Sequence, residues 1–505
     1  GEELVPLADG TYRAENEGRH GDAADAFLAL SRAEPQRADW VVAAGRCLGR
    51  AGRLDEALDL LDAARARFPG FVDVEAMLAR TLLLRVEREP GMPHPEVLWA
   101  DAAALAEGVL DKQPDHEDAR LLLAQTRYLL GDWDRAVAEA EEAVRRHPDR
   151  PGAHVLLGRI ATDRFRALST QHRLEQPQGR EAADLVAAID RQRRLARGAF
   201  ERAAALDPTR AYPHVALSQL AELDGRIDVA RAHLLDALAI DPDTPADHEG
   251  LTAGLSWQER RDLYRELHTR YLATTADPAA ARAAKAATLR FHEGRALLDG
   301  HEWAAARDAF RDAATANPGA SNAHYYWFLA AYWLDEHDEA EEHAAIYARA
   351  GAPAFADVLR ALPSEQRAQI AAIVQYLGDR AYAQGRIANS RDLNHVVACL
   401  KDSADAWNNH AVLCRATGRC DDAFTSYRDA LEREPDSPQL WNDAAVILQH
   451  HLPNPENLAK AREMYQRALA LAAAVLADPA SSAAARDAAR RASDNAQKNL
   501  AELPG

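Results

Sequence analysis

Apolar residues recur along most of this chain at the three- and four-residue intervals of amphipathic helices. The clearest stretch, 404–435, contains two such apolar faces, one on each side of Gly418. Their members are Trp407, Ala411 and Cys414 in the first helix and Ala423, Tyr427 and Ala430 in the second. Gly418 can take the left-handed conformation that ends a helix, and Pro435 cannot continue one. The stretch predicts two helices joined by a tight turn, with these side chains packed between them.

The same pattern returns along the chain with a constant period. Prolines that follow an apolar helix end are 34 positions apart in three pairs, namely Pro35 and Pro69, Pro114 and Pro148, and Pro208 and Pro242. The two tryptophans Trp407 and Trp441 have the same separation. A fixed period of this size indicates an array of helical hairpins in which neighbours bury one another's apolar faces.

These units resemble tetratricopeptide repeats, which have small and large residues, a turn glycine and a final proline at fixed positions. The matching residues are Gly45, Leu48, Gly52, Ala57, Leu61, Ala64 and Pro69; Leu123, Ala124, Gly131, Ala136, Ala140, Ala143 and Pro148; Leu217, Ser218, Gly225, Ala230, Leu234, Ala237 and Pro242; and Gly294, Leu297, Ala306, Phe310, Ala313 and Pro318. Small residues let the two helices of a unit approach closely. The resemblance implies an all-α, right-handed α-solenoid of about eleven hairpins with a C-terminal capping helix.

Breaks in the period divide the chain. Between the regular stretches, Trp257, Tyr264 and Tyr271 keep helical spacing without the repeat pattern. The polar C-terminal segment has the character of a cap that shields the last apolar face. The predicted parts are an N-terminal array (1–242, about six units, with insertions near 86–97 and 164–182), a non-repeat helical linker (243–286), a C-terminal array (287–478, about five units), and a capping helix with its tail (479–505).

Composition and charge narrow the range of partners. The chain is rich in alanine, which favours helices, and its net charge is −19. This charge argues against a broad nucleic-acid surface or an anionic membrane surface. No apolar run is long enough to cross a bilayer, and the first ten residues lack the regions of a signal peptide. The four cysteines lie in predicted helices rather than in a spaced framework, so we expect reduced thiols in a cytoplasmic protein.

The sequence contains no motif that indicates catalysis. A GxSxG elbow, an HExxH motif, paired CxxC motifs and a phosphate-binding glycine loop are all missing. Three histidines, His154, His214 and His324, stand at the tryptophan position of their own repeats, which indicates packing rather than metal binding. The adjacent His450 and His451 point to different faces of a helix, so a shared metal is not expected. The sequence therefore predicts no catalytic residue, metal site or cofactor.

The resemblance also predicts a binding surface. In tetratricopeptide arrays the first helices of successive units line a concave groove in which partner peptides or helices commonly lie. Arginine binds carboxylates through two parallel hydrogen bonds, so a row of arginines and amides is suited to an acidic peptide or C-terminus. The alternative is that each arginine pairs with acids of a neighbouring unit, such as Asp39, Asp73 or Asp118. The expected row is Arg46, Arg80, Gln125, Arg159, Gln219 and Arg295.

Beyond the non-repeat linker, the residues expected to line the groove are mainly aromatic rings and amides. Rings offer contact area with few rotatable bonds, and amides can bond a peptide backbone. Asn409 matches a family position at which backbone-binding asparagines occur in some members, although the other units do not repeat it. The alternative is that half of the rings belong to the interhelix core. The expected residues are Tyr325, Tyr326, Tyr332, Trp333, Tyr376, Tyr382, Asn408, Asn409, Asn442 and Asp443.

Together these features predict a non-enzymatic scaffold or adaptor that binds a protein or peptide in the concave groove of a superhelix. The arginine row leaves an acidic partner as one option, and neither nucleic acid nor membrane insertion is expected. Two alternatives remain open. One is a regulatory or sensor subunit that controls an enzyme partner in a larger signalling or defence assembly, and the other is a sensor of a small ligand or signalling peptide. The repeat pattern does not choose among them.

Overall fold

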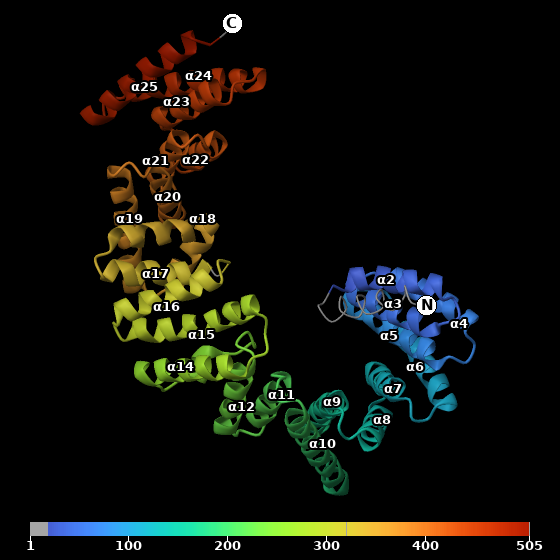
Figure 1. Cartoon of the computed structure of the whole chain (residues 1–505). Helices are drawn as coiled ribbons and strands as arrows, with labels where there is room; N and C mark the ends of the chain where they lie inside the picture. The colour runs from blue at the N-terminus through green and yellow to red at the C-terminus, as the bar shows by residue number, and fades with distance from the viewer. Residues whose placement is uncertain (1–18, 320, 504–505) are drawn as a thin grey trace. The chain divides into compact units, whose positions relative to one another are not determined.

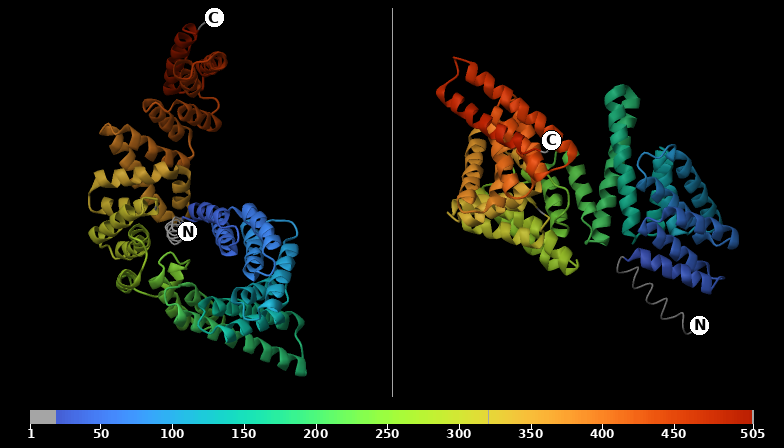
Figure 2. Two further views of the ribbon diagram at one scale, coloured as in Figure 1. Left: turned by 45° about the vertical axis from the view of Figure 1, so that its right-hand side comes forward. Right: turned by 90° about the horizontal axis from the view of Figure 1, so that it is seen from above.

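The computed structural model of the protein describes residues 19–319 and 321–503. Within these ranges all regular elements are helices, and no strand occurs. The predicted all-α class is thereby confirmed. The chain divides by its internal contacts into two compact units, Gly1–Ala246 and Asp247–Gly505. In each unit, helices that follow one another in the sequence lie side by side as a solenoid (Figures 1 and 2).

The first unit is built from helical hairpins of α2 to α12. Its helices are α2 (His20–Ala33), α3 (Ala38–Ala51), α4 (Leu54–Arg67), α5 (Val72–Arg88), α6 (Pro95–Lys112), α7 (Glu117–Leu129), α8 (Trp133–Arg146), α9 (Pro151–Glu175), α10 (Gly179–Leu206), α11 (Tyr212–Leu223) and α12 (Ile227–Ile240). The predicted insertion at 164–182 is mostly helical, because it lengthens α9 to 25 residues and α10 to 28 residues.

The second unit contains the remaining helices. They are α13 (His248–Leu251), α14 (Trp257–Thr274), α15 (Ala279–Asp299), α16 (Trp303–Ala316), α17 (Ser321–Trp333), α18 (His337–Ala361), α19 (Ser364–Ala383), α20 (Ile387–Lys401), α21 (Ala404–Ala416), α22 (Cys420–Arg433), α23 (Pro438–Val446), the π-helical turn η1 (Ile447–His451), α24 (Pro455–Ala477) and α25 (Ala483–Ala501). Helix α25 buries Ala489, Ala492 and Ala496 and packs against α23 and α24, as a terminal cap does.

The turn inside the hairpin of α21 and α22 has the conformation that the sequence predicts. Gly418 lies between the two helices with φ 75°, a left-handed conformation that glycine adopts without steric cost. Asp421 and Asp422 stand in the first turn of α22, where the helix dipole favours negative charge. The sequence motif therefore specifies both the end of one helix and the start of the next.

Small residues allow the two helices of a hairpin to cross closely. A Cβ atom on Gly158 of α9 would lie 2.7 Å from the ring of Phe200 on α10, and one on Gly294 would lie 2.8 Å from the ring of Phe310. Phe200 is 1% exposed and Phe310 is fully buried, so neither ring can move aside into solvent. The absence of a side chain at the glycine is what makes room for each ring.

Trp407 does not fill the interior of its hairpin as expected. It is half-buried, and its indole Nε1 donates a hydrogen bond to Asp402 Oδ1 at 3.1 Å. That bond holds the indole beside the C-terminal end of α20, because Asp402 caps this helix. The fully buried ring between α21 and α22 is Tyr427.

Among the described residues, none of the helices combines the length and the apolar character needed to cross a membrane.

The close crossing in the first unit can be tested with two glycines that differ only in their surroundings. Gly158→Ala should lower the free energy of unfolding by about 1–3 kcal/mol, because the new methyl group overpacks the contact with Phe200. Gly198→Ala on α10 meets no atom within 4 Å. It should raise the free energy of unfolding by up to about 1 kcal/mol through helix propensity. Urea unfolding followed by circular dichroism measures both, and equal effects of the two changes would contradict the account.

Candidate functional site

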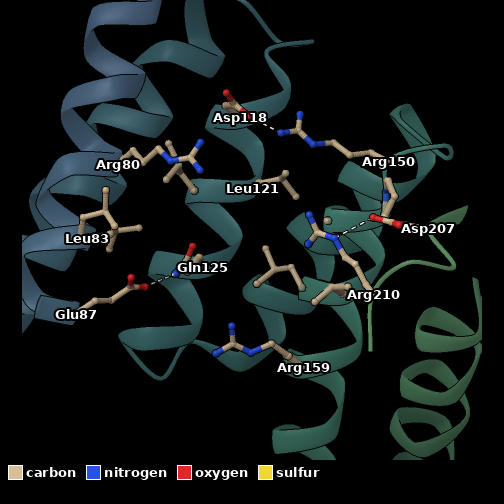
Figure 3. Close-up of a pocket in the computed structure, with 16 residues that line it drawn as sticks. Arg80, Leu83, Glu87, Asp118, Leu121, Gln125, Arg150, Arg159, Asp207 and Arg210 are labelled. Carbon is tan, nitrogen blue, oxygen red and sulfur yellow. Dashed lines mark hydrogen bonds and ion pairs between the residues drawn. The ribbon is translucent and has the colours of Figure 1, made fainter. Parts of the chain in front are cut away.

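A cavity of about 610 Å³ lies in the first unit, between α5, α7 and α9 and the turn that follows α10 (Figure 3). Leucine and valine side chains form an apolar part of its lining. Around them stand four arginines, three carboxylates and one amide. These polar residues are Arg80, Arg150, Arg159, Arg210, Glu87, Asp118, Asp207 and Gln125, and the apolar ones are Leu83, Leu84, Leu121, Leu122, Val155 and Leu156.

Three residues of the predicted row come together in this cavity. Arg80, Gln125 and Arg159 belong to α5, α7 and α9, which are first helices of successive hairpins. Because each occupies an equivalent position in its repeat, the three side chains project to the same side of the solenoid. Figure 3 shows Arg80 and Arg159 reaching from the two outer helices toward α7.

The charged groups of the cavity are not all neutralised. Arg150 pairs with Asp118 at 2.7 Å, and Arg210 pairs with Asp207 at 2.9 Å. Gln125 donates a longer hydrogen bond, 3.4 Å, to Glu87. Neither Arg80 nor Arg159, both exposed, has a hydrogen bond or ion pair within residues 19–319 and 321–503. The cavity therefore presents two uncompensated guanidinium groups beside an apolar floor.

The three acidic residues considered as alternative partners of the arginine row form ion pairs with other residues. Asp39 pairs with Arg37, Asp73 with His116, and Asp118 with Arg150. For Arg80 and Arg159, pairing within the array therefore does not account for the charge.

A smaller recess of about 220 Å³ adjoins this cavity and shares Gln125 and Arg159 with it. Trp99, Tyr128 and Ile160 contribute to its wall. Tyr128 donates a hydrogen bond of 2.6 Å to Asp163 Oδ2. Burial, with the nearby Asp163 charge, raises the pKa of Tyr128 to about 12, so its hydroxyl stays protonated at neutral pH. The recess offers space for an apolar side chain next to a guanidinium group.

The other members of the predicted row do not line this cavity. Arg46 is half-buried on α3, and Gln219 is exposed on α11. Arg295 belongs to the second unit, where it pairs with Glu249 at 3.5 Å and its guanidinium lies over the ring of Tyr326 at 5.5 Å.

In the second unit, several of the predicted binding residues are interior. Tyr325 is 6% exposed, and burial raises its pKa. Tyr326 is half-buried and stacks on Phe310. Asn442 is 3% exposed and accepts a hydrogen bond from Asn499 of the capping helix. The prediction that Tyr325 and Asn442 lie on a binding surface is therefore wrong. Both belong to the core, because neighbouring helices cover their side chains.

Three other predicted rings, Tyr332, Trp333 and Tyr376, join His301, Trp303 and His337 in a partly exposed aromatic strip. Trp333 stacks on Trp303 with ring centroids 5.8 Å apart, and Tyr332 meets Tyr376 at 6.3 Å. Trp333 and Tyr376 are 43% and 44% exposed. His301, Trp303 and His337 were missed from the sequence because they lie in hairpin turns or at the start of second helices. Tyr382 is 61% exposed near the end of α19.

The remaining amides and Asp443 lie farther along the second unit. Asn409 is exposed on α21, whereas the buried Oδ1 of its neighbour Asn408 has no hydrogen-bond partner among the described residues. Asp443 accepts hydrogen bonds of 2.8 Å from Gln439.

A cavity of about 330 Å³ in the second unit is lined by α18, α20, α21 and α22. Its arginines all have partners: Arg349 and Arg391 bind Asp392, at 2.9 and 2.6 Å, and Arg419 binds Asp422 at 2.5 Å. Buried Cys414 contacts His410, and burial raises its pKa to about 12, so it remains a thiol. The arginines of this cavity are therefore paired, and its thiol at Cys414 is not an activated nucleophile.

Comparison with known proteins identifies the repeats. Models described as tetratricopeptide repeat match residues 17–83, 99–160 and 408–474. These three segments of the chain are tetratricopeptide repeats. This assignment rests on the matched segments together with the helical hairpins that the structure places over them.

Solved structures of similar proteins cover different shares of this chain. MamA (41-end) from Desulfovibrio magneticus is 16% identical, with 41% of this chain and 97% of that chain covered and a TM-score of 0.30. YrrB, described as a TPR protein with an unusual peptide-binding site, is 15% identical over 44% and 95%, with a TM-score of 0.28. A chain of the Cut9–Hcn1 complex is 13% identical over 96% and 95%, with a TM-score of 0.30. No curated protein matches the sequence.

Buried histidines predict a pH-dependent stability. Burial lowers the pKa of His410 and His292 to about 3 and that of His343 to about 4, below the value of about 6.5 in an unfolded chain. Between these values the unfolded state binds more protons, so stability is complete above about pH 6.5 and falls as the pH decreases. Each ring should contribute a slope of up to about 1.4 kcal/mol per pH unit.

Urea unfolding at several pH values from about 7 to 5 measures this slope. His410→Gln should reduce it, whereas the exposed His94→Gln should leave it unchanged. A slope that is the same in the wild type and in His410→Gln would show that His410 is not held neutral by the fold.

Proposed function

We propose that this tetratricopeptide repeat protein is a non-enzymatic scaffold that binds an acidic peptide segment of a partner protein across α5, α7 and α9. The observation that carries the proposal is the pair of guanidinium groups of Arg80 and Arg159, which have no carboxylate partner in the described chain although the protein has a net charge of −19. A cation that the fold leaves uncompensated in an acidic protein is available to an anionic partner.

The groove suits a peptide that alternates carboxylates with apolar side chains. Carboxylates of such a peptide would accept paired hydrogen bonds from Arg80 and Arg159. Leu121 and Leu156 line the same cavity as these arginines and would cover an apolar side chain. Gln125, between the two arginines in the repeat order, would bond the peptide backbone. Charge and one apolar side chain would then determine which peptide binds, rather than a continuous row of amides.

The aromatic strip supports an adaptor with a second kind of contact. Trp333, 43% exposed, stacks on the half-buried Trp303, and uncharged aromatic rings of this kind are typical of the apolar centre of a protein interface. A charged groove on one unit and an aromatic surface on the other would bind two different partners, or two parts of one partner. This arrangement also fits a regulatory subunit that holds an enzyme, whereas a small-ligand sensor has no comparable support.

We place the protein in the cytoplasm because its cysteines are free thiols.

The proposal is tested with a panel of Asp- and Glu-rich peptides that each contain one leucine, measured by fluorescence polarisation on the full chain. For the best binder, the double change Arg80→Gln and Arg159→Gln should reduce affinity by about 10-fold or more, because two charge-assisted hydrogen bonds are lost. It should also flatten the dependence of affinity on salt.

A matched control has the same change in net charge outside the groove. Arg135 and Arg145 lie on α8, are 71% and 72% exposed and do not line the cavity. Their double change to Gln should leave affinity nearly unaltered. Equal affinity of the groove variant and the wild type at low and high salt would refute the proposal.

A further inference from the structure

The hairpin of α11 and α12 brings two imidazoles and a carboxylate together. His214 stands near the start of α11, and His233 and Asp236 stand three residues apart on α12. One donor atom from each of the three residues lies within 4.8 Å of the others. His214 Nδ1 is 3.9 Å from Asp236 Oδ2, and the two imidazole centroids are 5.7 Å apart.

We propose that this His–His–Asp cluster binds a divalent transition-metal ion of the Zn²⁺ class. Two imidazoles and one carboxylate form a ligand set that Zn²⁺ takes in proteins, with a fourth position left for water or a partner's side chain. Ca²⁺ and Mg²⁺ prefer ligand sets made of oxygen alone, so the two imidazoles select against them. The ion would join α11 to α12.

The placement of the ligands follows from helix geometry. Residues three apart on a helix project from the same face, so His233 and Asp236 both face α11. Metal–ligand bonds of about 2.0–2.2 Å require donor atoms closer together than 4.8 Å. All three side chains are half-buried rather than locked in the core, so small rotations about their side-chain bonds can bring the donors onto an ion.

An unsatisfied polar atom supports the same conclusion independently. His233 Nδ1 is buried and has no hydrogen-bond partner in the described structure. Buried polar atoms in folded proteins are almost always paired, because leaving one without a partner costs free energy. A metal ion in the cluster gives His233 a partner that the protein chain does not supply.

Other contacting histidines show why this pair is different. Ring contacts also join His248 to His292, His324 to His343, and His395 to His410. Within the described residues, however, the cluster at His214 is the one group in which three ligand atoms of His, Cys, Asp or Glu converge. The other pairs are accounted for by packing, whereas this pair also has a carboxylate within reach.

The test uses the full chain without a histidine tag. Zn²⁺ titration by calorimetry, with Mg²⁺ and Ca²⁺ as separate arms, should show one Zn²⁺ bound per chain and no comparable binding of the other two ions. Co²⁺ in place of Zn²⁺ should give the visible absorption of a four-coordinate site. Zn²⁺ should also raise the melting temperature, because the ion binds the folded hairpin.

Single changes at the cluster decide the assignment. His233→Gln and Asp236→Asn should each weaken Zn²⁺ binding by at least ~10- to 100-fold. Loss of a residue that only supports a metal ligand already has an effect of that size. His94→Gln is the control, because exposed His94 also contacts a carboxylate, Glu96 at 3.0 Å, without a third ligand. Zn²⁺ binding that is absent, or equally tight in Asp236→Asn and the wild type, would overturn the proposal. Circular dichroism confirms that each variant is folded, and Asp236, 42% exposed, provides the readout if His233→Gln does not fold.

Discussion

The close contact between a small residue on one helix and a large one on the next is the constraint on which the hairpins depend. It joins Gly45 to Leu61, and in the same way Gly158 meets Phe200 and Gly294 meets Phe310. With a larger residue at the glycine the two helices would separate, and the ring that fills the crossing would lose its contacts. Repetition of this contact sets the helices of each hairpin against each other in the same way, so successive first helices present equivalent positions on one side.

The cavity that we propose as a peptide groove is a consequence of that repetition. Arg80, Gln125 and Arg159 are far apart in the sequence and meet because three successive first helices are stacked in register. The second requirement is electrostatic. Nearby carboxylates are engaged by Arg150 and Arg210, which leaves the two row arginines without a partner in the described chain. The binding capacity that we propose would therefore come from the distribution of ion pairs as much as from the shape of the solenoid.

The sequence predicts the fold well because proline and glycine positions repeat with a constant period and each has a local conformational cause, as at Gly418. Of the predicted row, Arg80, Gln125 and Arg159 line one cavity, whereas Arg46, Gln219 and Arg295 do not. It does not show burial in α17, whose residues are apolar on every face, so that buried Tyr325 and exposed Trp333 look alike.

Contacts that involve turns or unequal repeat positions also escape a periodic pattern. Trp303 joins the aromatic strip from the start of a second helix, and Asp236 adds a carboxylate to the His214–His233 contact that the equivalent pair, His324 and His343, lacks. The central claim is that the cavity between α5, α7 and α9 holds an acidic segment of a partner. A photo-reactive amino acid at Leu121, on the cavity floor, tests it most directly in the native cell, with cross-linked peptides identified by mass spectrometry. The account predicts cross-links to a segment rich in Asp and Glu, and cross-links from Leu121 to segments without acidic residues would contradict it.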